Sequence, residues 1–391
     1  MNNSVFKICF SKKRLFVGML FQLVSLVSIA QVKTDTLSET ESVQLYKQLN
    51  KELNRKQKKY SVQVLPVVYY TPETRFSYGG LGVINFKFNY SDSLLKSSQI
   101  IPSFVFTQNK QMLAQIKFDL YSHRKWHIWG STGYFIYPYF FNGVGNTLAA
   151  KNVEWYEAKY PKLDINIYHQ IFNEYWSFGL KYDFQDSHIT PKTNQVLDTG
   201  NYAGARGSLQ SSIGLGVRYD SRDYFLSPTK GWFADLSLQW ADKWSGASFS
   251  NQYAKIDIRK YFTLSQKNDV LAFQIYSEIH TKEIPFNLMA LLGGSQQMRG
   301  YRKGVYRDKQ MWVYQLEYRS RLFFKHVGVA AFANLGGIGN TYRDVNQNYR
   351  FTYGGGLRIA PIKTERYFIR LDYGVNQMAE GLFYFAIGEA F

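Results

Sequence analysis

The sequence predicts an all-β fold, a membrane-spanning barrel of the outer-membrane type with sixteen antiparallel strands. Apolar and polar residues alternate from Ser61 to the end of the chain, so each strand has an apolar face and a polar face. The strands are about ten residues or longer, the length that a tilted strand needs to cross a bilayer. Aromatic residues gather at strand ends, as in Tyr134–Phe141, where their rings suit a lipid interface. A soluble sandwich would alternate in the same way, so strand length and aromatic placement favour the membrane barrel.

The first thirty residues have the pattern of a secretory signal peptide. Four basic residues between positions 7 and 14 precede an apolar run, Leu15–Ala30, that ends in the small residues Ser28 and Ala30. This run is short for a spanning helix, which needs about 20 residues, so we expect residues 1–30 to be cleaved off after Ala30. Cys9 is the single cysteine and lies in this segment, so the exported chain has no disulfide or thiolate chemistry.

Residues 31–60 are a polar segment before the first predicted strand. Within it, Glu41–Lys59 has leucines at 45, 49 and 53, which is a helical spacing. The segment is either a solvated tether or a periplasmic helix that contacts a partner, the lipid surface or the barrel mouth. It is too short to hold separate periplasmic domains, and we expect the barrel to be residues 61–391.

Sixteen segments have strand character, and an even number lets both termini lie on the periplasmic side of the outer membrane. The connections after odd-numbered strands are then extracellular, and most long ones fall there, at 141–152, 189–207, 282–310 and 337–348. The other connections are mostly short, with 221–230 as the main exception. The predicted strands are 62–71, 76–90, 98–108, 111–121, 126–140, 153–170, 174–188, 208–220, 231–242, 249–264, 269–281, 311–322, 326–336, 349–360, 367–376 and 382–391.

A basic chain that is exported predicts anionic lipid rather than nucleic acid as the partner of its surface. The formal net charge is +18, but an exported chain meets anionic lipid and lipopolysaccharide phosphates instead of nucleic acid. Charged residues on the polar strand faces, such as Arg218, Asp220, Asp257 and Arg259, are expected to neutralise one another in a wet interior. The histidines, at 123, 127, 169, 188, 280 and 326, show no metal-ligand spacing. We therefore expect neither catalysis nor a cofactor or metal.

The most distinctive stretch is the polar loop Gly293–Asp308. Glycines at 293, 294, 300 and 304 permit backbone angles that other residues avoid, and Arg299 projects a permanently charged fork of five donors. The sequence Met298-Arg299-Gly300-Tyr301 and the glycine pair before it resemble the arginine-glycine-aromatic signature of the bacterial surface antigen family of outer-membrane barrels. That family includes BamA, TamA and the two-partner secretion transporters. Further segments with this resemblance are Tyr69–Thr74, Phe141–Asn146, Tyr219–Asp223, Pro228–Trp232, Gln315–Arg319 and Gly354–Arg358.

The resemblance covers Pro66 to Phe391 and implies a set of site residues. In the family the loop folds back into the barrel, and its arginine reaches acidic residues on the inner wall. Here Glu317 and Asp372 face inward by strand parity, so they are the expected partners of Arg299 in a loop lock that also includes Gly300 and Tyr301. The sequence departs from the family at Asn334, where many relatives carry an aspartate. The alternative is that Arg299 is merely a solvated loop charge.

The strand ends predict a weak seam. Pro66 in the first strand has no amide hydrogen to donate, and the last strand, which must pair with it, contains Gly388. The chain closes on Phe391, an aromatic carboxyl terminus that resembles the signal read when outer-membrane barrels are assembled. The seam could open as a lateral gate that pairs with a substrate strand. Alternatively, Pro66 sits at a non-bonded position and has no role.

By resemblance, the expected activity is the insertion or translocation of protein or lipid at the outer membrane, without the periplasmic POTRA domains that many members carry. Binding and strand exchange would drive it, with a client barrel protein or a periplasmic protein as partner. Two alternatives remain open at this point: a passive diffusion channel for small polar solutes, and a barrel that anchors or exports a separate soluble protein.

Overall fold

The computed structural model describes residues 60–391 except 91, 93–94, 124, 147–152, 193–196, 198–201, 265–268, 321, 324–325 and 361–367. The described residues form one closed barrel of sixteen antiparallel strands, and two further short strands pair as a separate hairpin. The fold class predicted from the sequence is thereby confirmed. The expected signal peptide and all of the expected periplasmic segment except Tyr60 lie outside the described residues and stay predictions.

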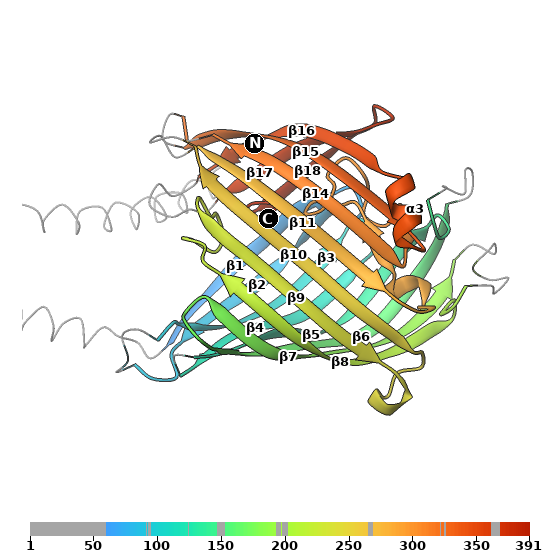
Figure 1. The fold of residues 1–391 in the computed structure, drawn as a ribbon, viewed down its shortest axis with the longest axis horizontal. Coiled ribbons are helices and arrows are strands. Elements are labelled where there is room, and N and C mark those ends of the chain that lie inside the picture. The colour runs from blue at the N-terminus through green and yellow to red at the C-terminus, as the bar shows by residue number, and fades with distance from the viewer. Residues whose placement is uncertain are drawn as a thin grey trace, which may run out of the picture. The chain divides into compact units, whose positions relative to one another are not determined.

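The strands follow one another around the barrel in chain order (Figure 1). Their bounds are β1 (Tyr60–Thr71), β2 (Arg75–Phe86), β3 (Ser98–Thr107), β4 (Met112–Ser122), β5 (Trp126–Phe141), β6 (Glu154–Gln170), β7 (Trp176–Pro191), β8 (Gly207–Asp220), β9 (Gly231–Ala241), β10 (Asn251–Thr263), β11 (Val270–His280), β12 (Ala290–Leu292), β13 (Tyr306–Asp308), β14 (Gln310–Arg319), β15 (Val327–Gly339), β16 (Arg350–Ile359), β17 (Ile369–Asn376) and β18 (Gly381–Ile387).

The β12–β13 hairpin lies in the connection between β11 and β14. Strands β11 and β14 pair directly with each other, from Val270 with Arg319 to Ile279 with Gln310. The β12–β13 hairpin is therefore not one of the strand pairs of the barrel sheet. The short helices η1 (Lys243–Ser245), η2 (Phe286–Leu288) and α3 (Tyr342–Gln347) also lie in connections. Over the described part of the chain, no helix is both long and apolar enough to cross a membrane.

The alternation of apolar and polar residues along the strands gives the barrel wall an apolar outer face and a polar inner face. In β9, Leu236 and Leu238 are exposed on the outer face, whereas Phe233 and Asp235 are buried on the inner face. The same split holds in β14, where Leu316 is exposed and Glu317 is fully buried. An outer face of exposed leucines and aromatics around a polar interior is the pattern of a wall that is surrounded by lipid.

The barrel closes through a very short ladder between β1 and β18. Their register contains a single pair, Tyr70 with Phe385, whereas β1 pairs with β2 along its whole length, from Tyr60 with Phe86 to Thr71 with Arg75. The stretch of β1 from Tyr60 to Tyr69, which includes Pro66, therefore has no partner on β18. Most of the amide and carbonyl groups on this edge of β1 are left without a ladder partner.

The last strand is shorter than expected, which corrects the predicted bounds 382–391. It ends at Ile387 because Gly388 turns the chain out of the sheet with a φ of +86°, a conformation that favours glycine. The Gly388 amide donates to the Phe368 carbonyl, over 2.8 Å. The final three residues leave the sheet, and Phe391 is buried against Tyr261, Val270 and Ala272. Gly388 and Phe391 therefore do not form part of the seam.

Candidate functional site

The connection between β11 and β14 is built as a buried loop. After β12, the glycines at 293, 294, 300 and 304 all have positive φ, so the chain turns tightly before it returns as β13. Met298 and Tyr301 of this loop are buried in an apolar cluster with Met311, Val313 and Ile338 of β14 and β15. The loop tip thus lies against the inward faces of these two strands.

Arg299 is fully buried between two carboxylates. One guanidinium nitrogen donates to Glu317 of β14, and the other donates to Asp372 of β17 over 2.5 Å. The guanidinium carbon lies 3.6 Å from the centre of the Phe332 ring, so the cation also stacks on an aromatic face. Both carboxylates are fully buried with it. The structure therefore pairs Arg299 with the two acids that strand parity had pointed inward.

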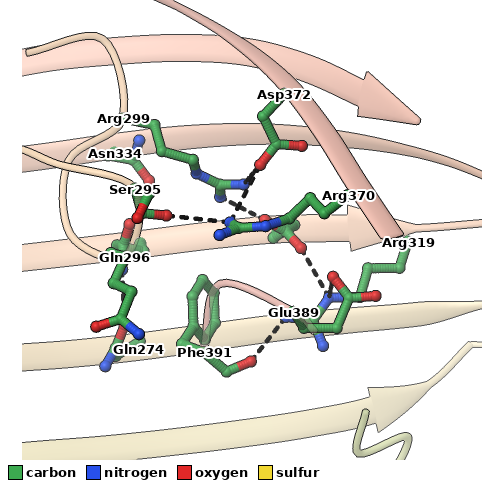
Figure 2. A network of polar contacts seen from close by, with 12 residues as sticks. Gln274, Ser295, Gln296, Arg299, Arg319, Asn334, Arg370, Asp372, Glu389 and Phe391 are labelled. Atoms are coloured by element: carbon green, nitrogen blue, oxygen red, sulfur yellow. Dashed lines mark hydrogen bonds and ion pairs between the residues drawn. The ribbon is translucent and has the colours of Figure 1, made fainter. Parts of the chain in front are cut away.

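Three more arginines share these carboxylates, and Figure 2 shows two of them, Arg319 and Arg370. Arg358 donates to Asp372 over 2.6 Å and to Glu389 over 2.7 Å, and Arg319 donates to Glu317 over 2.7 Å. Main-chain oxygens accept further hydrogen bonds, from Arg319 at Phe391 and from Arg370 at Ser295. Buried charges require such multiple partners, because their loss of hydration is compensated only by several short hydrogen bonds.

Glycines on the neighbouring strands let the loop backbone approach closely. A Cβ added at Gly374 of β17 would stand 2.8 Å from both the carbonyl carbon of Arg299 and the nitrogen of Gly300. A Cβ at Gly336 of β15 would stand 2.8 Å from the sulfur of Met298. Both distances are shorter than van der Waals contact, so the missing side chains at these two positions make room for the loop tip.

The loop is hydrogen-bonded to both sides of the seam. On the β18 side, the Tyr384 hydroxyl accepts from the Gly300 amide over 3.0 Å and donates to the Tyr301 carbonyl over 3.1 Å. On the β1 side, the Lys303 amide donates over 2.6 Å to Glu73, which follows β1 in the turn to β2. One loop therefore connects the two strands that share only a single ladder pair.

The hairpin at the base of the loop is anchored to the opposite wall. Arg307 of β13 is buried, and its guanidinium donates to the Phe140 carbonyl of β5 over 3.0 Å. The Gly145 amide donates to the Arg307 carbonyl over 2.8 Å. Tyr139 of β5 donates its hydroxyl hydrogen to the Lys303 carbonyl. The loop and its hairpin thus contact β5 as well as β14, β15, β17 and β18.

Asn334 and Pro66 are not among the hydrogen-bond partners of Arg299. Asn334 donates its amide hydrogen to Thr352 over 2.8 Å, and its oxygen has no hydrogen-bond partner. Pro66 lies in the part of β1 that has no partner on β18, and on the other side it pairs with Gly80 of β2. The sequence reasoning missed Arg319, Arg358, Arg370, Glu389, Tyr384 and Glu73. Inward parity alone could have found Arg358 and Arg370, but no sequence signal marks Glu73 as a partner of the loop.

The half of the barrel around β5–β11 holds a polar cavity of about 480 Å³. Its wall carries charges of both signs, among them the pair of Arg218 with Asp235, joined over 2.7 Å through Nε. Nearby, Arg259 donates to Asp257 over 2.6 Å. Among the described residues, no group of three histidine, cysteine, aspartate or glutamate side chains could hold a metal ion.

Comparison with known proteins gives one family and several structural neighbours. The family model for the Omp85 superfamily domain matches residues 74–391. The structure is similar to that of BamA from Haemophilus ducreyi lacking POTRA domains 1–3, with a TM-score of 0.60 and 14% identity over 85% of this chain and 70% of that chain. It is also similar to CdiB from Acinetobacter baumannii, with a TM-score of 0.56 and 14% identity over 85% and 60% of the two chains. CdiB from Escherichia coli gives a TM-score of 0.58 and 11% identity over 85% and 63%. No curated protein matches the sequence.

Proposed function

The chain belongs to the Omp85 superfamily, and from this premise we propose that it inserts or translocates client proteins at the outer membrane through a barrel gated by its β11–β14 loop. In the proposed orientation both termini face the periplasm, so this loop is the sixth extracellular loop and folds back into the lumen. The observation that carries the proposal is the complete burial of Arg299 between Glu317 and Asp372.

The contacts of the loop support a gate rather than a fixed stopper. Gly300 and Tyr301 bond to Tyr384 of β18, whereas Lys303 bonds to Glu73 beside β1. Because β1 and β18 share one ladder pair, these hydrogen bonds are a large part of what links the two strands. Movement of the loop tip out of its seat would therefore weaken the seam and expose two strand edges to a client strand.

The nature of the charges supports a mechanism without nucleotide hydrolysis. The lock consists of hydrogen-bonded ion pairs, which a client can replace by offering its own strand and side chains. In the proposed mechanism the free energy of client folding drives the cycle, and loop release and seam opening lower the barrier. The partners of this activity are a client barrel or secreted protein and the surrounding outer-membrane lipid.

A passive channel is the second candidate function, and the polar cavity of about 480 Å³ favours it. Its mixed lining, with Arg218, Asp235 and Asp257, would suit small polar solutes of either charge. The loop and hairpin contacts to β5 and to β14–β18 argue against a wide open bore. The third candidate, an anchor for a soluble partner, depends on residues 31–59, which lie outside the described part of the chain.

Single-channel conductance in planar bilayers tests the proposal. Wild-type barrels should show small, flickering currents, and Arg299→Ala should show large, steady ones, because the loop tip loses its ion pairs. Arg218→Ala is the matched control, since it removes an inward arginine that does not touch the loop. Large steady currents in the wild-type protein would contradict the gate and favour the channel. Arg299→Lys, which keeps the charge, should be intermediate.

A further inference from the structure

The outer face of the β1–β5 wall contains a shallow hollow of about 530 Å³. Strand registers place the residues of its lining on adjacent strands, with Val64 opposite Gly82 and Phe104 opposite Ala114. Val64, Phe104 and Ile116 are exposed on the outer face, so the hollow opens away from the lumen. The lining residues on this outward parity are Val64, Gly80, Gly82, Pro102, Phe104, Ala114, Ile116 and Thr132.

Small residues create the hollow. Many outward positions elsewhere carry large side chains, such as Leu236 and Leu238 of β9. Gly80 is not needed for internal packing, because a Cβ added there would meet nothing closer than 3.9 Å. This contrasts with Gly374, where the missing Cβ makes room for the loop. The missing side chain at Gly80 therefore only leaves space on the outer surface.

A break in the sheet lies at the same place. The β2–β3 ladder runs to Leu81 with Ser103 and resumes at Ile84 with Ile100. Pro102 lies in the gap and has no amide hydrogen to donate to β2. A Cβ added at Gly82 would stand 3.3 Å from the Pro102 ring, so the two residues lie side by side along the floor.

The hollow offers a ligand almost no polar group. Ser103 and Gln115 point to the other side of the sheet, where the Ser103 hydroxyl donates to the Gln115 carbonyl and the Gln115 side chain donates to Ser131. Thr132 is the one polar residue of outward parity among the described lining residues. A ligand that needs no hydrogen bond is therefore the one that fits.

We propose that this hollow binds one acyl chain of a membrane lipid. The hollow is continuous with the exposed apolar belt of the barrel, so the medium that covers it is the hydrocarbon of the bilayer. An empty depression there would forfeit dispersion contacts that a hydrocarbon chain restores. The lining crosses five strands, about 19 Å at ~4.8 Å per strand spacing. That matches the ~15 Å depth of one leaflet of the hydrocarbon core when the chain lies obliquely.

The hollow borders β1, the strand that forms the weakly paired side of the seam. Its edge is Val64 of β1, within the stretch whose other edge has no partner on β18. A chain seated there packs against the strand that forms the weak side of the seam. A bound acyl chain would thus contact β1 independently of the loop.

Lipid retention tests the site on the full-length exported protein. The barrel is reconstituted in palmitoyl-oleoyl phosphatidylethanolamine nanodiscs, released into detergent and measured by native mass spectrometry. The wild type should retain a bound phosphatidylethanolamine, and the double variant Gly80→Leu, Ala114→Leu should lose it because leucine side chains fill the hollow. Ala333→Leu is the matched control, since Ala333 is exposed on the outer face of β15, away from the hollow. Equal retention in all three proteins would overturn the proposal.

A second measurement does not depend on filling the hollow. A photoreactive benzoylphenylalanine replaces Phe104 at its rim, and the sample is irradiated in the same nanodiscs. An adduct with the mass of the lipid supports the proposal. An adduct with a second copy of the chain, or with a co-purified protein after irradiation in membranes, would overturn it, as would the absence of any adduct.

Discussion

The two halves of the barrel interior use the same chemistry to different ends. Around β14–β18, Arg299 and Glu317 form an ion pair whose side chains are both 0% exposed. Around β8–β9, Arg218 and Asp235 form a pair whose side chains are 20% and 9% exposed and face the polar cavity. Water screens the second pair and can solvate either partner when the other is lost. Water cannot reach the first pair, so of these two pairs it is the one that holds a segment in place.

Removal of the buried arginine should have the largest effect. Arg299→Ala leaves Glu317 and Asp372 with less compensation, and the free energy of unfolding should fall by about 3–5 kcal/mol. Arg218→Ala should cost only about 1–2 kcal/mol, because its partner stays near water. Urea-induced unfolding in detergent micelles, followed by tryptophan fluorescence, measures both. Equal losses would mean that the two halves do not differ in the way described.

Closing the space under the loop tip should have the next largest effect. Gly374→Ala places a Cβ 2.8 Å from the Arg299 and Gly300 backbone, which should cost about 1–3 kcal/mol through overpacking. The loop should also become more accessible to protease, since its tip can no longer seat. Gly355→Ala is the control, because its Cβ would lie 3.3 Å from a single carbonyl oxygen, that of Ala330. If the loop of Gly374→Ala resists protease as well as the wild-type loop does, the close approach of the loop tip to Gly374 does not hold the loop in place.

The link from the loop to the last strand should contribute less. Tyr384→Phe removes one hydroxyl that joins Gly300 and Tyr301 to β18, which should cost about 1–2 kcal/mol. The seam should open more readily, so a Tyr70→Cys, Phe385→Cys disulfide should form more slowly in a Tyr384→Phe background. Tyr373→Phe is the control, because Tyr373 is exposed on the outer face. If Tyr384→Phe leaves the rate of cross-linking unchanged, the contact between the loop and β18 does not control opening of the seam.

The sequence predicted the fold well because periodicity and strand length are local. The alternation that exposes Leu316 and buries Glu317 can be read from two adjacent residues. Parity also pointed Glu317 and Asp372 inward, and the family resemblance supplied Arg299. The contact between Lys303 and Glu73 could not be predicted in this way, because it joins residues 230 apart through the closure of the barrel. The turn at Gly388 was missed although parity offered a signal, because Glu389 shares the outward parity of Phe383 and Ile387 and a longer strand would turn its carboxylate toward lipid.

A change at Asn334 of β15 should give the smallest effect and sharpens the comparison most. Four arginines share three side-chain carboxylates in this half, Arg319 also donates to an oxygen of the last residue, Phe391, and the Asn334 oxygen and the Arg299 Nε atom both lack partners. Asn334→Asp should therefore raise the free energy of unfolding, by about 1 kcal/mol, because the added carboxylate lies beside Arg299, whose Nε atom has no partner.

The matched change Asn376→Asp should have the opposite sign. Asn376 donates its amide hydrogen to Glu380 over 3.0 Å, so a carboxylate there would face another carboxylate and lose that hydrogen bond. Urea unfolding of the two variants at neutral pH compares them directly. If both variants lose stability, the buried arginines of β14–β18 are already neutralised by the carboxylates and carbonyl groups around them. The lock would then depend on the geometry of Arg299 and its two acids rather than on a surplus of positive charge.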